Sequence, residues 1–222
     1  MLESKLTQLK TEIIEFSNLI LDMFKNSIKY IFLKQPDGLK KIIEEQEPKA
    51  NNYEISLEES CIYISAQYNP KAYDLRFIFC VLKMSNDFER IADHAVNIAQ
   101  SGLYLIEKNP MLIHNYKTDI DYLFKLADNM LTGSITSFIE ENAPKAKILC
   151  GLDQEVDKYK SKTYKKIIDE IKTTPSNIED YLHLERIVNN IERIADLSTN
   201  ICEDIIFLYE ARIIKHHKDE QL

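Results

Sequence analysis

The eight residues Asn86-Asp87-Phe88-Glu89-Arg90-Ile91-Ala92-Asp93 recur later in the chain as Asn189-Asn190-Ile191-Glu192-Arg193-Ile194-Ala195-Asp196. Six of the eight positions are identical. At the same offset, Asn97-Ile98 matches Asn200-Ile201. A match of this length at one fixed offset indicates an internal duplication, so the fold is expected to consist of two similar halves.

Periodic apolar residues predict three helices in the first half of the chain. One apolar face extends over residues 2–35, and a second covers residues 39–69. Pro48 interrupts the second pattern, and a kink or a new helix start is expected there because proline lacks an amide hydrogen. A third helix is expected from about residue 71 to about residue 107.

The second half repeats this order. A fourth helix is expected over residues 113–142, and a fifth over 149–173 with Leu152 on its apolar face. A sixth begins at about Ser176 and continues into the polar tail at residues 216–219.

Six long helices with short connections pack as antiparallel bundles. The sequence therefore predicts an all-α fold of two pseudo-symmetric three-helix bundles. The first bundle is expected over residues 1–108 and the second over residues 109–222.

Composition supports helices and excludes one class of partner. The chain has only four glycines and no tryptophan, which leaves little material for the tight turns of a sheet-rich fold. Its formal net charge is −8. Proteins that bind nucleic acid take their affinity from lysine and arginine on phosphates, so no nucleic-acid partner is expected.

The four cysteines, Cys61, Cys80, Cys150 and Cys202, match neither a zinc motif nor a disulfide scaffold. Cys80 and Cys202 lie in apolar helical segments and are interpreted as reduced core thiols. Reduced thiols favour a cytoplasmic location.

No segment is expected to cross a membrane or to act as a signal peptide. Glu12, Glu15 and Asp22 interrupt the apolar residues of the first helix, and no other apolar stretch is long enough to span a bilayer. Membrane contact is expected only through partners.

Paired carboxylates mark both copies of the repeated motif. Glu89 and Asp93 are four residues apart, as are Glu192 and Asp196, so each pair shares one helix face. Like charges at this spacing destabilise an isolated helix by roughly 0.2–0.5 kcal/mol. A cation or a basic partner would remove that cost.

In the sixth helix the pair belongs to a longer acidic stripe with four carboxylates, at Glu185, Glu192, Asp196 and Glu203. The fifth helix adds a further pair with the same spacing, Asp153 and Asp157. Such oxygens suit hard or borderline cations such as Mg²⁺, Mn²⁺, Ca²⁺ or iron. Two plainer interpretations stay open: a solvated polar face, and an acidic helix start at Asp153.

With these motifs in view, the sequence resembles the PhoU family. Residues 74–76, 82–83 and 86–99 look like the first-repeat signature of that family. Residues 192–196, followed by 198–204, are similar to the second-repeat signature. With the duplication included, the resemblance covers nearly the whole chain.

The resemblance implies two three-helix bundles that bind divalent or trivalent metal ions (iron, manganese, magnesium or zinc). The implied ligands are three pairs: Glu89 with Asp93, Asp153 with Asp157, and Glu192 with Asp196. It also implies a negative regulator of phosphate uptake and phosphate-starvation signalling. Such a protein would contact the ATPase of a phosphate ABC transporter and a sensor histidine kinase, and a homodimer stays open.

Two positions depart from the family pattern. Leu197 stands where the family usually has histidine, and Asn51 stands where an acidic residue is expected. Asn51 lies in the first repeat, and the stripe of the second repeat holds four carboxylates against two in the first, so we expect stronger metal binding in the second repeat.

Two rival functions stay open. One is a di-metal carboxylate enzyme of the four-helix type, but such sites use Glu-x-x-His pairs, which the chain lacks. The other is a helical adaptor without metal. The chain has no glycine-rich phosphate loop and no recognisable nucleophile motif, so a protein without enzymatic activity is expected.

Overall fold

The computed structural model describes residues 1–211, and these residues form helices without any strand. The long helices are α1 (Leu2–Leu33), α3 (Glu47–Tyr68), α4 (Tyr73–Lys108), α6 (Lys117–Ile139), α8 (Asp153–Thr173) and α9 (Ile178–Glu210). Shorter helices are α2 (Pro36–Lys41), α5 (Pro110–Asn115) and α7 (Ala143–Cys150). The predicted all-α class is confirmed.

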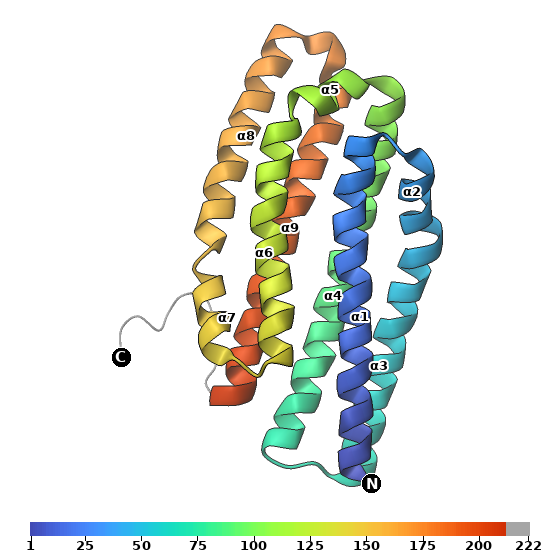
Figure 1. Cartoon of the computed structure of the whole chain (residues 1–222), viewed down its shortest axis with the longest axis vertical. Helices are drawn as coiled ribbons and strands as arrows, with labels where there is room; N and C mark the ends of the chain where they lie inside the picture. The colour runs from blue at the N-terminus through green and yellow to red at the C-terminus, as the bar shows by residue number, and fades with distance from the viewer. Residues whose placement is uncertain (212–222) are drawn as a thin grey trace.

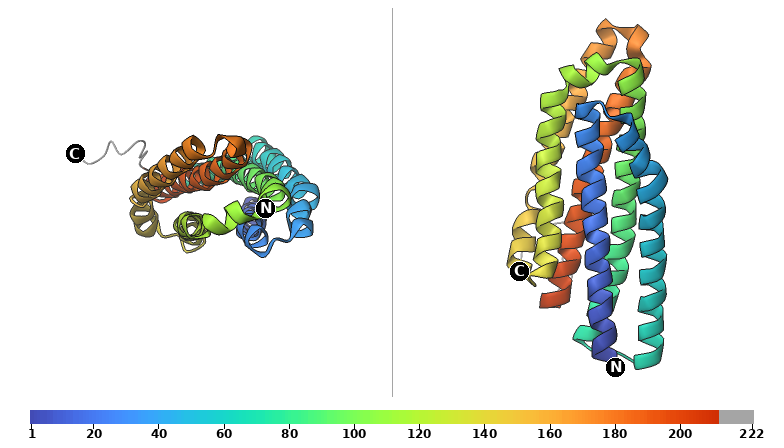
Figure 2. Two further views of the ribbon diagram at one scale, coloured as in Figure 1. Left: turned by 90° about the horizontal axis from the view of Figure 1, so that it is seen from above. Right: turned by 45° about the vertical axis from the view of Figure 1, so that its right-hand side comes forward.

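The long helices form two bundles side by side, with α1, α3 and α4 in one and α6, α8 and α9 in the other (Figure 1). The most extensive helix–helix contact joins α4 to α9, so the two helices that carry the repeated motif form the centre of the molecule. Further views show the same elongated double bundle (Figure 2). The two predicted bundles are confirmed, and the division at residue 108 stays a prediction.

The predicted break in the second helix is present. A turn of π-helix at Ile42–Gln46 separates α2 from α3, and α3 begins directly after it with Pro48 in its first turn. Proline is tolerated there because the first amides of a helix have no intrahelical partner.

The fifth helix differs from the prediction, since it is two helices rather than one. The amide of Gly151 donates to the Ile148 carbonyl at 3.2 Å, and that of Leu152 donates to the Leu149 carbonyl at 3.0 Å. These tighter i to i−3 bonds end α7, and Asp153 then begins α8. The sixth helix, α9, begins at Ile178, and the tail at residues 216–219 lies outside the described residues.

One continuous apolar core spans both bundles. The faces of α4 and α9 that lie opposite the acidic residues are apolar and buried. They include Phe88 and Ala92 in α4, and Ile191 and Ile194 in α9. Burying these faces fixes how both helices are rotated about their axes, and so determines where the carboxylates lie.

No helix within residues 1–211 combines enough length with enough apolar character to span a bilayer, as predicted.

Candidate metal centre

Three carboxylates from two helices converge in the second bundle. Asp157 lies near the start of α8, and Glu192 and Asp196 lie one turn apart on α9. One oxygen of each of the three side chains lies within 4.8 Å of the others. Among the described residues, this acidic triad is the group whose spacing would let one cation contact three side chains.

Glu192 is the buried member of the triad, at 7% exposure. Its Oε1 forms an ion pair with Lys160 Nζ at 2.8 Å. Its Oε2 is buried and accepts no hydrogen bond. Arg193 Nε lies 3.8 Å from Oε2, too far for a hydrogen bond. A buried carboxylate oxygen without a donor is costly, and a metal ion would satisfy it.

The pKa of Asp196 is raised by burial and by the negative charges around it. Burial, together with the charges of Glu192, Asp153 and Asp157, raises the pKa of this carboxyl to about 6, while Arg193 opposes them. Arg193 Nη1 lies 3.4 Å from Asp196 Oδ2. A bound cation would favour the ionised form and reverse this shift.

Asp153 lies one turn before Asp157, at the first residue of α8. It lines a hollow of about 330 Å³ together with His94, Arg193 and Asp196. The four carboxylates predicted on α8 and α9 are thus brought into one region, with Asp153 at its edge.

The first repeat places its carboxylates less favourably. Burial raises the pKa of Glu89, and the charges of Asp93, Glu54 and Glu47 add to this, while Arg90 opposes them. Burial and the charge of Asp93 likewise raise the pKa of Glu47. These groups share one region, but within residues 1–211 their oxygens do not converge as the acidic triad does.

Sequence reasoning missed two buried aspartates between the repeats. Asp87 on α4 and Asp204 on α9 are 8% and 9% exposed. Lys83 Nζ lies 2.6 Å from Asp204 Oδ1. Burial and then the charge of Asp204 raise the pKa of Asp87 to about 6, against the opposing effects of Arg90, Lys83 and Asn200.

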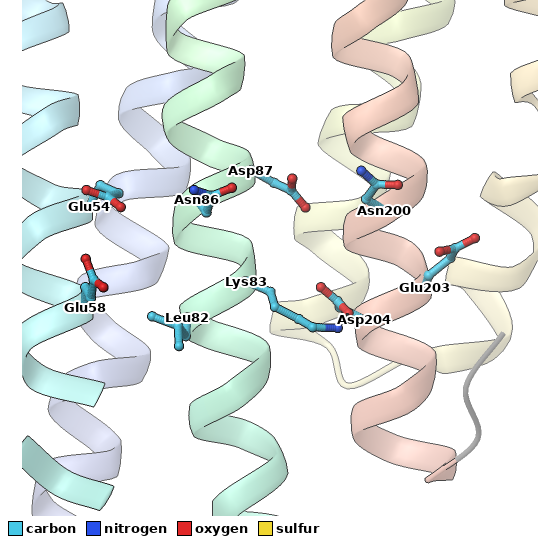
Figure 3. A pocket seen from close by; sticks show the side chains of 9 residues that line it. All are labelled: Glu54, Glu58, Leu82, Lys83, Asn86, Asp87, Asn200, Glu203 and Asp204. Atoms are coloured by element: carbon cyan, nitrogen blue, oxygen red, sulfur yellow. Dashed lines mark hydrogen bonds and ion pairs between the residues drawn. The ribbon is translucent and has the colours of Figure 1, made fainter. Parts of the chain in front are cut away.

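These residues line an acidic groove of about 540 Å³ between α3, α4 and α9 (Figure 3). Lys83 and Asp87 point from α4 toward Asn200 and Asp204 on α9 (Figure 3). The wall from α3 adds Glu54 and Glu58. Asp87 belongs to the repeated motif, but its counterpart is Asn190, so the repeat alone gave no signal for a carboxylate at this position.

Further polar contacts join the two copies of the motif. His94 Nδ1 donates to Asn190 Oδ1 at 2.7 Å. Burial lowers the pKa of His94, so a neutral ring that donates to this amide is favoured. Arg186 donates to Asn97 Oδ1. His94 thus forms a hydrogen bond between the two central helices, α4 and α9.

The donor set of the second repeat suits a hard or borderline metal ion. It offers carboxylate oxygens only, of the kind that magnesium, manganese and iron prefer. The Oε2 atom of Glu192 is the buried oxygen that such an ion would satisfy. Asp157, Glu192 and Asp196 therefore fit a metal ion that would bridge α8 and α9.

Fold and site together define a duplicated three-helix-bundle protein whose central helices carry repeated carboxylate pairs. A family model described as the PhoU domain matches residues 13–102 and 120–205, one match in each repeat. The chain belongs to the PhoU family.

Full-length relatives agree. A protein of Aquifex aeolicus, described as a phosphate-specific transport system accessory protein PhoU homolog, is 27% identical over 96% of this chain and 94% of its own. A homolog of the same description in Borreliella burgdorferi is 28% identical over 94% of this chain and 96% of its own. The crystal structure of the phosphate transport system regulatory protein PhoU from Streptococcus pneumoniae matches with a TM-score of 0.88 and 24% identity, covering 97% of this chain and all of that one.

Proposed function

We propose that this protein is a negative regulator of phosphate uptake and phosphate-starvation signalling, and that it acts by contact with other proteins rather than by catalysis. The observation that carries the proposal is the match over nearly the full length to relatives described as accessory proteins of the phosphate-specific transport system. Because both repeats are matched, the whole molecule is expected to share that role.

The proposed partners are the ATPase of a phosphate ABC transporter and a sensor histidine kinase. The acidic groove gives them a surface of suitable charge, since it combines Glu54, Glu58 and Asp87 on a chain of net charge −8. Complementary potential steers a basic partner face to such a surface. Contact from the cytoplasm would bring the protein to the membrane through its partner.

The proposal includes a metal ion at Asp157, Glu192 and Asp196. The buried Oε2 of Glu192 and the raised pKa of Asp196 both favour a cation there. By linking α8 to α9, the ion would hold the acidic surface of the second repeat in one shape. At Glu89 and Asp93 we propose weaker binding, because fewer oxygens converge.

Deleting the gene tests the regulatory role. Phosphate-starvation genes are expected to be expressed in phosphate-replete medium, and the wild-type gene is expected to restore repression. A complementing copy with Glu192→Ala and Asp196→Ala is expected to restore it only partly. A deletion strain with normally repressed starvation genes would contradict the proposal.

Partner contact needs its own measurement. Affinity purification of the tagged chain from phosphate-replete cells is expected to recover the transporter ATPase or the sensor kinase. The matched variant combines Glu54→Lys and Glu58→Lys, two exposed or half-exposed positions on the groove wall, and is expected to recover less of either protein. Unchanged recovery would exclude the groove as the contact surface.

A further inference from the structure

Two of the four cysteines lie against each other. Cys150 is the last residue of α7, and Cys202 lies on α9, which packs along α7. A side-chain hydrogen bond joins the two thiols. Both cysteines are free, so the pair is reduced in this structure.

The other two cysteines have different surroundings. Cys61 Sγ lies 3.7 Å from the Ile78 carbonyl, and Cys80 Sγ lies 3.7 Å from the Asp204 carbonyl. Each is 1% exposed. They serve as internal controls, because an oxidant that reached every thiol would modify them as well.

The members of the Cys150–Cys202 pair differ in access to solvent. Cys202 is 1% exposed, whereas Cys150 is half-buried. The hydrogen bond from Cys202 also lowers the pKa of Cys150, although burial and the charges of Glu203 and Asp153 oppose this. An accessible thiol with enhanced thiolate character beside a buried second thiol is the arrangement of a reactive cysteine and its resolving partner.

We propose that Cys150 and Cys202 form an intramolecular disulfide when the protein meets hydrogen peroxide, so that oxidation ties α7 to α9. The Cys150 thiolate attacks one peroxide oxygen, the O–O bond breaks, and hydroxide leaves as Cys150 becomes a sulfenic acid. The sulfur of Cys202 then attacks the sulfur of Cys150. An S–S bond forms, the sulfenic hydroxyl leaves with the proton from Cys202 as water, and two thiols have reduced one peroxide to two waters.

The proposed bond sets how closely α7 and α9 must approach each other. A disulfide needs the two Cα atoms about 4.4–6.8 Å apart. Helix α7 has only eight residues, and it is bounded by the turn at Asn142 and the break at Gly151. We expect any adjustment that the bond needs to fall on this short helix rather than on the long helices. Because Asp153 follows three residues after Cys150, the new bond would also fix the turn that begins α8.

The test treats the reduced full-length protein with hydrogen peroxide in the presence of a chelator. Peptide mapping without reduction is expected to show one cross-linked pair, Cys150 with Cys202, lighter by two hydrogens and cleaved by dithiothreitol. Before oxidation, iodoacetamide is expected to label Cys150 roughly tenfold faster than Cys61 or Cys80. The Cys61→Ala/Cys80→Ala variant is expected to form the same cross-link.

A second experiment removes the resolving thiol, Cys202. The Cys202→Ala variant is expected to accumulate a sulfenic acid at Cys150 that dimedone traps. Three results would overturn the proposal: a cross-link between two chains, over-oxidation of Cys150 in the wild type without a cross-link, or modification of Cys61 or Cys80 before Cys150. The wild-type map and labelling rates decide the matter even if a variant fails to fold.

Discussion

Glu192 shows how much of the site depends on single residues. Its spacing from Asp196 was evident in the sequence, but its burial and its ion pair with Lys160 were not. Lys160 belongs to another helix, and a helical repeat predicts neighbours only along its own helix. The sequence therefore predicted which residues share a helix face. It did not predict that Lys160 neutralises Glu192, because that contact depends on how α8 packs against α9.

Replacing Lys160 with methionine should show whether this lysine takes the place of a metal. Without metal, the variant loses the partner of a nearly buried carboxylate. We expect a loss of about 2 kcal/mol in the free energy of unfolding, between the values for surface and buried pairs. Chemical denaturation with and without Mn²⁺ measures this, and added metal should restore more stability to Lys160→Met than to the wild type.

The matched control is Lys166→Met. Lys166 lies on the same helix and pairs with Asp119 at 2.8 Å, away from the acidic triad. Its variant should gain no more from metal than the wild type. An equal metal response in all three proteins would refute competition between Lys160 and the ion.

Metal affinity should depend on pH through Asp196. Its folded-state pKa is raised to about 6, and the proton must leave before the oxygen can bind an ion. Affinity should therefore be fully present above that pH and fall roughly tenfold for each unit below it. Isothermal titration with Mn²⁺ across this range measures the slope, and Asp196→Asn should flatten it. A pH-independent affinity in the wild type would contradict the assignment.

Without metal, the contribution of Asp196 to folding stability should change with pH in the opposite direction to metal affinity. The pKa of Asp196 is higher in the folded state than in the unfolded state. At pH values between the ordinary pKa of aspartate and about 6, the folded chain therefore holds the proton more tightly than the unfolded chain. The Asp196 contribution to stability thus decreases as pH rises through that window. Asp196→Asn removes this contribution.

Among the elements, the long helices were predictable because their apolar periods are long and proline marks their limits. The break between α7 and α8 was not predicted, since Leu149 and Leu152 continue an apolar pattern across it. A periodic pattern records which side chains are buried but not where one helix stops. The break matters for the site, because α8 begins there with Asp153 in its first turn.

Helices α4 and α1 pack closely at Gly102, and a substitution there tests this packing. A Cβ at this position would overlap Cγ1 of Ile31, which is fully buried on α1. We expect Gly102→Ala to destabilise the protein by about 1–3 kcal/mol through overpacking. Gly151→Ala is the control, because its new Cβ would meet only the Ile148 carbonyl at 3.4 Å. Thermal unfolding of both variants decides, and equal melting temperatures would contradict this close approach.

For the whole molecule, the repeated motif predicted the duplication but not the way the copies meet. The structure joins them through α4 and α9, with Lys83 paired to Asp204 and His94 hydrogen-bonded to Asn190. Asp87 and Asn190 occupy equivalent positions yet differ in charge. The acidic groove therefore arises from the difference between the repeats, which sequence symmetry does not reveal.

The continuous core predicts that neither half is stable alone. Residues 1–108 would expose the apolar face of α4, and residues 109–222 would expose that of α9. Each half, expressed separately, should aggregate or lack a cooperative unfolding transition. Co-expressed halves should assemble into one complex, as gel filtration and circular dichroism would show. Two independently stable, monomeric halves would contradict a shared core.

The most direct test of the central claim, that the second repeat holds a metal ion, is elemental analysis of protein purified without chelators. Three proteins are compared: the wild type, Glu192→Ala/Asp196→Ala, and Glu89→Ala/Asp93→Ala. We predict metal in the wild type, little change in the first-repeat variant, and loss of most of the metal in the second-repeat variant, with all three equally helical. Equal metal content in the three proteins would contradict the claim.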